Sequence, residues 1–333
     1  MMGKKTVITF QKLKAANAND AMDQLFEIFE DKYPILVAED QTKWYFQLNW
    51  PIDKYWYVDP DLFSQKNDNI LSCNDIPTYY KQYDDGRMHI SVSMLHSKAI
   101  LGISEILHFI KIDTIVHIDD HSDLMAPLLY RQGDGFYTSL FEGEIKITDI
   151  NHMEKCIERG VFGIGSYLSA FILMTEPGFI YHIKQSSAFI SSTTYSLYPR
   201  IKSQHIGGYS LKQTFLDKKD RHEGDALWKY KQTNNFEDVE ETVGNVWLDI
   251  DLDYFSNRYD RDTDWKNKNT LNPNRAEMIA LMQHTLLKIT TSHWIKQVQF
   301  VSISYSPGFF PSEYFKEAQH FFIQPLIEYF KGR

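Results

Sequence analysis

The chain has 333 residues, 43% of them hydrophobic, which is enough to bury a sizeable core in one large α/β domain or two smaller ones. Its formal net charge of −9 argues against a general nucleic-acid-binding protein, which would carry a basic surface. With two cysteines and no apolar run typical of a signal peptide or a membrane span, we expect a cytoplasmic protein with reduced thiols.

The first 85 residues combine strand-like runs with one helix. Apolar residues recur at helical spacing over residues 19–29, which predicts a helix. Residues 33–38 and 44–48 are rich in aromatic and branched apolar residues, which predicts two strands. We interpret residues 1–85 as an N-terminal extension of a single domain that spans residues 1–333.

A β-α-β unit is the clearest local pattern. Residues 89–94 alternate like a strand, residues 97–111 place apolar side chains at helical spacing, and residues 113–118 form a nearly continuous apolar run. The two strands are therefore expected to be parallel and joined by a right-handed crossover.

The rest of the chain continues to alternate strands and helices. Further helices are expected over residues 153–160, in a run ending at residue 174, from Asn272-Pro273 to residue 291, and over residues 311–330; further strands are expected over residues 179–183, 188–190, 248–252 and 298–303. Residues 204–244 are polar and charged, so we interpret them as a surface excursion with little core of its own. The alternation predicts a three-layer α/β/α fold with a mainly parallel sheet.

Ligand-type side chains occur at every second position where two apolar strands end, and a histidine ends the strand before them. The set is His96, Asp119, His121, Asp123, Asp249 and Asp251. Side chains two apart in an extended chain share one side, and parallel strands bring their carboxyl ends to one edge of a sheet. Four buried carboxylates would repel one another unless cations bind between them, and oxygen ligands with some imidazole suit manganese. The sequence therefore predicts two Mn²⁺ ions.

Other interpretations of each acidic motif become weaker when the two motifs, residues 119–123 and residues 249–253, are considered together. Asp119-Asp120-His121 alone is more often a turn with solvated charges. The motif from Asp249 to Asp253 alone could be an edge strand or a calcium loop, but a calcium loop would need a glycine and a late glutamate that are absent. His117 is interpreted as a core histidine or a support for the ligands. Asp120 points away from them in a regular strand, so it is interpreted as a capping or supporting carboxylate.

The pair of motifs resembles the ureohydrolase superfamily of arginases and agmatinases, which also have an earlier His-Ser like His96-Ser97. Residues 249–255 read Asp-Ile-Asp-Leu-Asp-Tyr-Phe, whereas the family normally continues Asp-x-Asp-x-x-Asp-Pro. This ending resembles a divergent branch that includes the peptide arginases of ribosomal-peptide pathways, which convert arginine residues of a precursor peptide to ornithine. The resemblance covers residues 88–125 and 245–256.

The resemblance implies an arginase-like fold and a division of the ligands between two manganese ions. One ion would be bound by His96, Asp119, Asp123 and Asp249, and the other by Asp119, His121, Asp249 and Asp251. Two bridged ions can lower the pKa of a shared water, and the resulting hydroxide would attack the guanidinium carbon. Asp123 would orient this nucleophile and relay its proton to the leaving amine.

The substrate-binding residues differ from the arginase pattern. Ser304 stands where arginases have a glutamate that binds the guanidinium, so the acceptor would be Asp253, Glu313 or Asp120. The Asn-x-His loop that recognises a free α-carboxylate is also absent, which favours a peptide substrate. The turn containing Ser166 and Tyr167 is interpreted either as a wall of the substrate pocket or as a tight turn between a strand and a helix.

Two further functions stay open at this stage. The first is hydrolysis of free arginine or another small guanidino compound. The second is a non-catalytic module that binds arginine-containing peptides. A zinc deacetylase of the related type is disfavoured because the sequence has no adjacent His-His pair.

Overall fold

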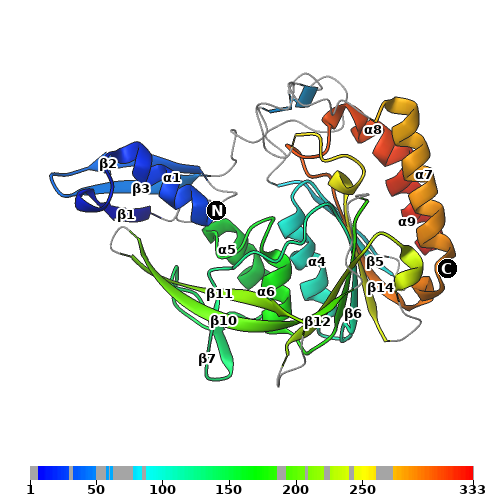
Figure 1. The fold of residues 1–333 in the computed structure, drawn as a ribbon, viewed down its shortest axis with the longest axis horizontal. Helices are drawn as coiled ribbons and strands as arrows, with labels where there is room; N and C mark the ends of the chain where they lie inside the picture. Colours follow the sequence, from blue (N-terminus) through cyan, green and yellow to red (C-terminus); the bar gives the residue numbers. More distant parts are fainter. Residues whose placement is uncertain are drawn as a thin grey trace. The chain divides into compact units, whose positions relative to one another are not determined.

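The computed structural model describes two compact units of the chain (Figure 1). The described residues are 7–29, 33–49, 58–59, 61–62, 78–84, 88–185, 193–206, 209–220, 226–239, 244–259 and 273–332. Unit 1 comprises Met1–Ile52, Asp123–Thr175 and Tyr198–Asp217, and unit 2 comprises Asp53–Ser122, Glu176–Leu197 and Lys218–Arg333. The single domain expected from the sequence stays a prediction.

Unit 1 begins with a small antiparallel sheet covered by one helix. Its strands β1 (Val7–Gln11), β2 (Tyr33–Glu39) and β3 (Lys43–Asn49) are arranged in the order β1-β3-β2, and α1 spans Ala18–Phe29. Helix α1 buries Ala21, Leu25 and Phe29 in a core with Phe10 and Phe46, which is the apolar face that its spacing predicted. The predicted helix and both predicted strands of this region are confirmed.

The remaining elements of unit 1 follow Asp123. They are β7 (Tyr130–Gln132), β8 (Gly135–Tyr137), α5 (Ile150–Arg159) and α6 (Tyr167–Met174). Helix α5 starts three residues earlier than expected because the Asp149 side chain accepts hydrogen bonds from the backbone N–H groups of Asn151 and His152. It ends where Gly160 adopts a left-handed φ of 74°, as the glycine in the sequence indicated.

A nine-stranded, mostly parallel sheet carries the core of unit 2. The strands are β4 (Tyr80–Asp84), β5 (His89–Ser93), β6 (Thr114–Ile118), β9 (Phe179–Ile183), β10 (Thr194–Ile206), β11 (Tyr209–Lys219), β12 (Trp228–Thr233), β13 (Val246–Asp251) and β14 (Val298–Ser304). Their order is β11-β10-β12-β9-β6-β13-β14-β5-β4, and β10 and β11 continue from one unit into the other. All neighbours from β12 to β5 are parallel, so the prediction of a mainly parallel sheet is confirmed.

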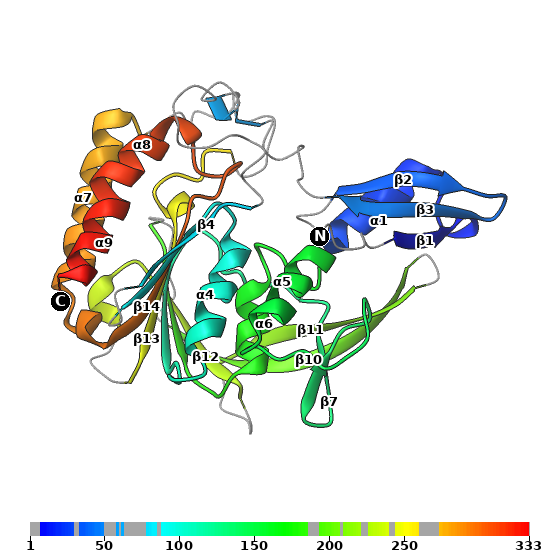
Figure 2. The same cartoon turned by 180° about the vertical axis from the view of Figure 1, so that it is seen from behind.

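Helices lie on both faces of the sheet in unit 2. Figures 1 and 2 show α4 (Ala99–Ile106) on one face, and α7 (Arg275–Thr291), α8 (Phe315–Ala318) and α9 (Gln324–Lys331) on the other. Helix α4 approaches β14 closely at Gly102, where a Cβ atom would lie 2.6 Å from the Phe300 ring. His96 lies in the 3₁₀ turn that joins the carboxyl end of β5 to this helix.

Three helices differ in their bounds from the sequence-based expectation. Helix α4 is shorter than residues 97–111 and follows a 3₁₀ turn at His96–Lys98. Helix α7 begins after Asn274, which forms a capping box with Glu277, so Pro273 precedes the cap instead of occupying the first helical position. The C-terminal helix is divided, since Ser312–Tyr314 is a 3₁₀ turn and a π-helical segment at Gln319–Ile323 separates α8 from α9.

Residues 204–244 differ from the expected surface excursion. They contribute the end of β10, all of β11 and all of β12, which lies between β10 and β9 inside the sheet. Trp228 and Tyr230 are each 1% exposed, whereas Lys229 between them is exposed. Because the apolar side chains alternate with lysines, the average polarity of the segment conceals a half-buried strand.

The strand expected over residues 188–190 lies outside the described residues. Among the described helices, none combines the length and the apolar character that a membrane crossing requires.

Candidate metal centre

A row of buried polar side chains crosses five adjacent parallel strands of unit 2. Its members are paired in register across the sheet: His182 of β9, His117 of β6, Asp249 of β13, Ser302 of β14 and Ser91 of β5. None of them is more than 2% exposed. Register partners on parallel strands project from the same face, so this row places charged groups together inside the protein.

Asp249 lies at the centre of the row. Its Oδ1 is 3.1 Å from His96 Nε2, and its Oδ2 is 2.9 Å from His117 Nδ1. The Ser302 hydroxyl donates to Oδ1 and itself accepts a hydrogen bond of 2.6 Å from Trp247 Nε1. Burial raises the pKa of Asp249, but the opposing effect of the His96 charge and the hydrogen bond from His117 is larger, so this pKa is well below its usual value.

His96 connects the carboxylates of two strands. Its Nδ1 is 2.9 Å from Asp251 Oδ2 and 3.2 Å from Asp119 Oδ2, while Nε2 faces Asp249. The Ser306 hydroxyl donates to Asp251 Oδ2 from a residue whose φ of 46° is left-handed, which is uncommon for a residue with a side chain. The turn after β14 therefore delivers a hydroxyl to the same carboxylates.

A second group lies around His121, just after β6. His121 Nδ1 is 2.8 Å from Asp253 Oδ2 and 3.8 Å from Asp119 Oδ1. Asp253 Oδ1 accepts from the backbone N–H of Asp120. Burial, and next the charge of Asp251, raise the pKa of Asp253 to about 6, so its ionised form is less favoured than that of an ordinary aspartate.

These contacts assemble two sets of atoms that could hold a metal ion in unit 2. One set comes from His96, His117 and Asp249, and the other from Asp119, His121 and Asp253; within each set the ligand atoms lie within 4.8 Å of one another. The donors are carboxylate oxygens and imidazole nitrogens, a chemistry that fits a divalent cation without thiolate ligands. The sequence assigned neither His117 nor Asp253 to the metal ligands.

The six predicted ligands are not all placed in one unit. His96, Asp119, His121, Asp249 and Asp251 all belong to the clustered side chains of unit 2. Asp123 is the first residue of the Asp123–Thr175 segment, which belongs to unit 1. It is 7% exposed and has a left-handed φ of 49°. Its assignment as a ligand and proton relay stays a prediction.

His182 is a residue that the sequence analysis missed. Its Nε2 is 3.0 Å from the backbone carbonyl oxygen of Asp119, and its Nδ1 is 2.6 Å from the Tyr230 hydroxyl. A carbonyl only accepts, so Nε2 donates and the neutral ring accepts the Tyr230 proton at Nδ1. Burial, and next the His117 charge, hold the pKa of His182 well below its usual value. The only sequence signal was a histidine inside an apolar strand.

The Asp120 side chain has partners other than the clustered carboxylates. It is 3.3 Å from Lys184 Nζ and accepts a hydrogen bond of 2.9 Å from Asn257 Nδ2. The same Asn257 nitrogen is 3.3 Å from His121 Nε2. This geometry agrees with the interpretation of Asp120 as a supporting carboxylate.

The candidate substrate residues of unit 2 have other partners. Ser304 Oγ donates to the Met94 carbonyl oxygen at 3.1 Å, and Glu313 forms an ion pair of 2.7 Å with Arg258. Asp253 is bound to His121, as described above. None of the three is therefore assigned to substrate by its contacts.

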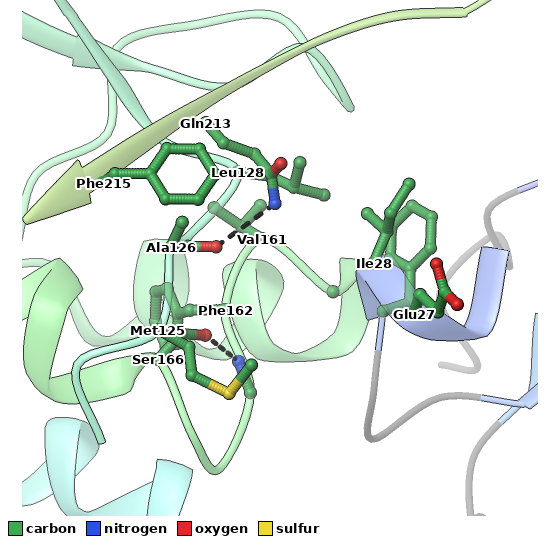
Figure 3. A pocket seen from close by; sticks show the side chains of 13 residues that line it. Glu27, Ile28, Met125, Ala126, Leu128, Val161, Phe162, Ser166, Gln213 and Phe215 are labelled. Carbon is green, nitrogen blue, oxygen red and sulfur yellow. Dashed lines mark hydrogen bonds between the residues drawn. The ribbon is translucent and has the colours of Figure 1, made fainter. Parts of the chain in front are cut away.

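The candidate turn of unit 1 borders a pocket (Figure 3). The cavity of about 260 Å³ is lined by both apolar and polar groups from α1, the segment after Asp123, the α5–α6 turn and β11, including Ile28, Met125, Phe162 and Phe215. Ser166 is a lining residue, and its hydroxyl accepts from the Gly163 N–H at 2.9 Å. Tyr167 is fully buried. The turn therefore borders a pocket, and its role in binding substrate stays a prediction.

Neither a protein-family model nor a curated protein matches the sequence. The functional assignment therefore depends on the motifs and on the geometry of the cluster.

Proposed function

We propose that the protein is a dimanganese hydrolase of the arginase-like type, with a three-layer fold, that converts arginine residues of a ribosomal precursor peptide to ornithine and urea. The observation that supports this most directly is the convergence of His96, Asp119, Asp249 and Asp251 at the carboxyl ends of three parallel strands. Hydrolysis of free arginine is the second candidate, favoured by the same cluster.

The ligands proposed for the metal pair are His96, Asp119, His121, Asp123, Asp249 and Asp251. When bound, manganese would supply a water of lowered pKa as the nucleophile. His117 and Ser302 would hold the Asp249 carboxylate in place through their hydrogen bonds. His182 would fix the Asp119 backbone in the same way.

Solvent reaches this cluster on the side of His121. Its side chain is 37% exposed, whereas the side chains of Asp119, Asp249 and Asp251 are at most 5% exposed. The Phe309 ring packs edge-on against His121 with 5.3 Å between ring centroids. We infer that the arginine side chain approaches past His121, since the other ligands are closed to solvent.

Metal analysis tests the site directly. Protein stripped with a chelator and reloaded with manganese is expected to contain about two ions per chain, because four or more carboxylates need that much positive charge. Elemental analysis by mass spectrometry measures the stoichiometry. Asp220→Asn, on an exposed residue of unit 2, is a matched control that should keep the full metal content. A value near one ion, or activity with zinc alone, would contradict the two-manganese proposal.

Product analysis tests the substrate. An arginine-containing precursor peptide is expected to lose about 42 Da per converted arginine, the mass exchanged when a guanidine is hydrolysed to an amine and urea. Peptide mass spectrometry and a urea assay measure both products, and a peptide with lysine in place of arginine is the control. Rapid urea release from free arginine with no change in any peptide would assign the second candidate. Peptide binding without turnover by the manganese-loaded protein would indicate a binding module.

A further inference from the structure

Strand β2 forms an outer edge of the small sheet in unit 1. The strand order is β1-β3-β2, and β2 pairs with β3 from Tyr33↔Asn49 to Glu39↔Trp44. Within the part of the chain that the structure describes, β3 is the only strand partner of β2. An edge strand presents backbone N–H and C=O groups on its outer side, where another extended chain can pair.

The side chains of this edge are unusually apolar for a surface. Ile35, Leu36 and Val37 are 39%, 37% and 50% exposed. Natural edges are often protected by lysines or prolines, but the strand has no lysine, and its proline, Pro34, is near the start. A bulge between Leu36 and Ala38 adds local twist, and bulges are a further common protection of natural edges. The stretch Ile35–Glu39 thus offers both pairing groups and apolar contacts.

The segment that contains this edge is also strongly acidic. Residues 18–40 hold seven acidic residues and one lysine, while Lys12 and Lys14 after β1 and Lys43 at the start of β3 add positive charge beside them. Asp23 and Glu27 are exposed on α1, and Glu39 and Asp40 are exposed at the end of β2. Lys12 offsets one of these charges through a contact of 2.9 Å with Glu39. An extended partner at this edge would therefore be favoured if it were basic.

We propose that the outer edge of β2 binds a basic, extended peptide by β-strand addition. The backbone of the peptide pairs with Ile35–Glu39, its apolar side chains contact Ile35 and Val37, and its arginines face the acidic residues of α1 and the β2 end. The identity of this peptide as the arginine-containing precursor rests on the proposed function. The edge would then hold the substrate chain at a place separate from the residues that hold the metal.

Binding of labelled peptides to the full-length protein tests this surface without any need for turnover. The probe is a fluorescein-labelled peptide that repeats Arg-Thr-Val, measured by fluorescence anisotropy at near-physiological salt. A peptide that repeats Arg-Pro-Val keeps the charge but has fewer backbone donors, and it is expected to bind at least about tenfold more weakly. A peptide that repeats Glu-Thr-Val is expected not to bind, because its charge has the same sign as the surface.

Lysines placed on the edge should block it. The double variant Ile35→Lys/Val37→Lys is expected to weaken binding of the Arg-Thr-Val peptide by at least about tenfold, through charge repulsion and loss of apolar contact. The matched control is Phe109→Lys/Leu287→Lys, which adds the same charge at apolar residues that are 86% and 58% exposed in unit 2. Circular dichroism confirms that both variants are folded. Equal affinity of the two double variants would overturn the proposal.

Three other outcomes are informative. A dimer that disappears in Ile35→Lys/Val37→Lys, without peptide binding by the parent protein, would assign the edge to a second copy of the chain and overturn the proposal. Urea release that is unaffected by the edge substitutions would remove the docking role and leave the proposed function standing. Peptide binding that requires the edge, without urea release, would keep the docking site and remove the proposed function.

Discussion

Replacing Asp249 by asparagine is expected to lower the turnover of an arginine-containing peptide by about 10³-fold or more, equivalent to ~4 kcal/mol of lost transition-state stabilisation. Both oxygens of Asp249 are engaged, one with His96 and Ser302 and the other with His117. Asparagine keeps the size but removes the negative charge and turns one acceptor into a donor. We therefore expect the substitution to lower both the metal content and the activity. Elemental analysis measures the first and urea assays the second.

The neighbouring substitution Asp120→Asn is the matched comparison. Asp120 is about one third exposed, pairs with Lys184 and accepts from Asn257, so its charge is not part of the buried cluster. We expect a loss of activity below about tenfold and full metal content, consistent with a weak, partly solvated ion pair. A larger loss with full metal content would identify Asp120 as the group that binds the guanidinium. Full turnover and full metal content in Asp249→Asn would exclude a bridging role for Asp249.

The second large effect is expected on stability. Trp228→Ala should lower the free energy of unfolding by about 3–5 kcal/mol, as is usual when a large buried aromatic side chain is removed. Trp228 is 1% exposed in β12, and its ring packs so tightly over Gly178 that a Cβ atom there would lie 2.7 Å from it. Urea unfolding followed by far-UV circular dichroism measures the change.

The control for this stability prediction is Phe109→Ala. Phe109 is 86% exposed, so its removal should change the free energy of unfolding by less than about 0.5 kcal/mol. If Trp228→Ala left the unfolding midpoint as unchanged as the control does, β12 would not be part of the core of the sheet.

The amino-acid sequence by itself determined several local elements and the edge of the sheet where most of the ligand-type side chains lie. The spacing of apolar residues predicted α1, β5 and β6, because helical and strand periods are properties of a few neighbouring residues. The same period of two placed Asp249 and Asp251 on one side of a strand, and the parallel β-α-β unit brought His96 to the same edge of the sheet. These inferences need only the chain direction and the geometry of an extended backbone.

Only the tertiary structure decided which strands are neighbours. The register of β6, β13 and β14 places His117 and Ser302 on either side of Asp249, although they are 132 and 53 residues away in the chain. The tertiary structure also places β12 between β10 and β9 in the sheet, where Trp228 and Tyr230 are buried despite the lysines around them. Strand order and register depend on contacts between distant segments, and no local period encodes such contacts.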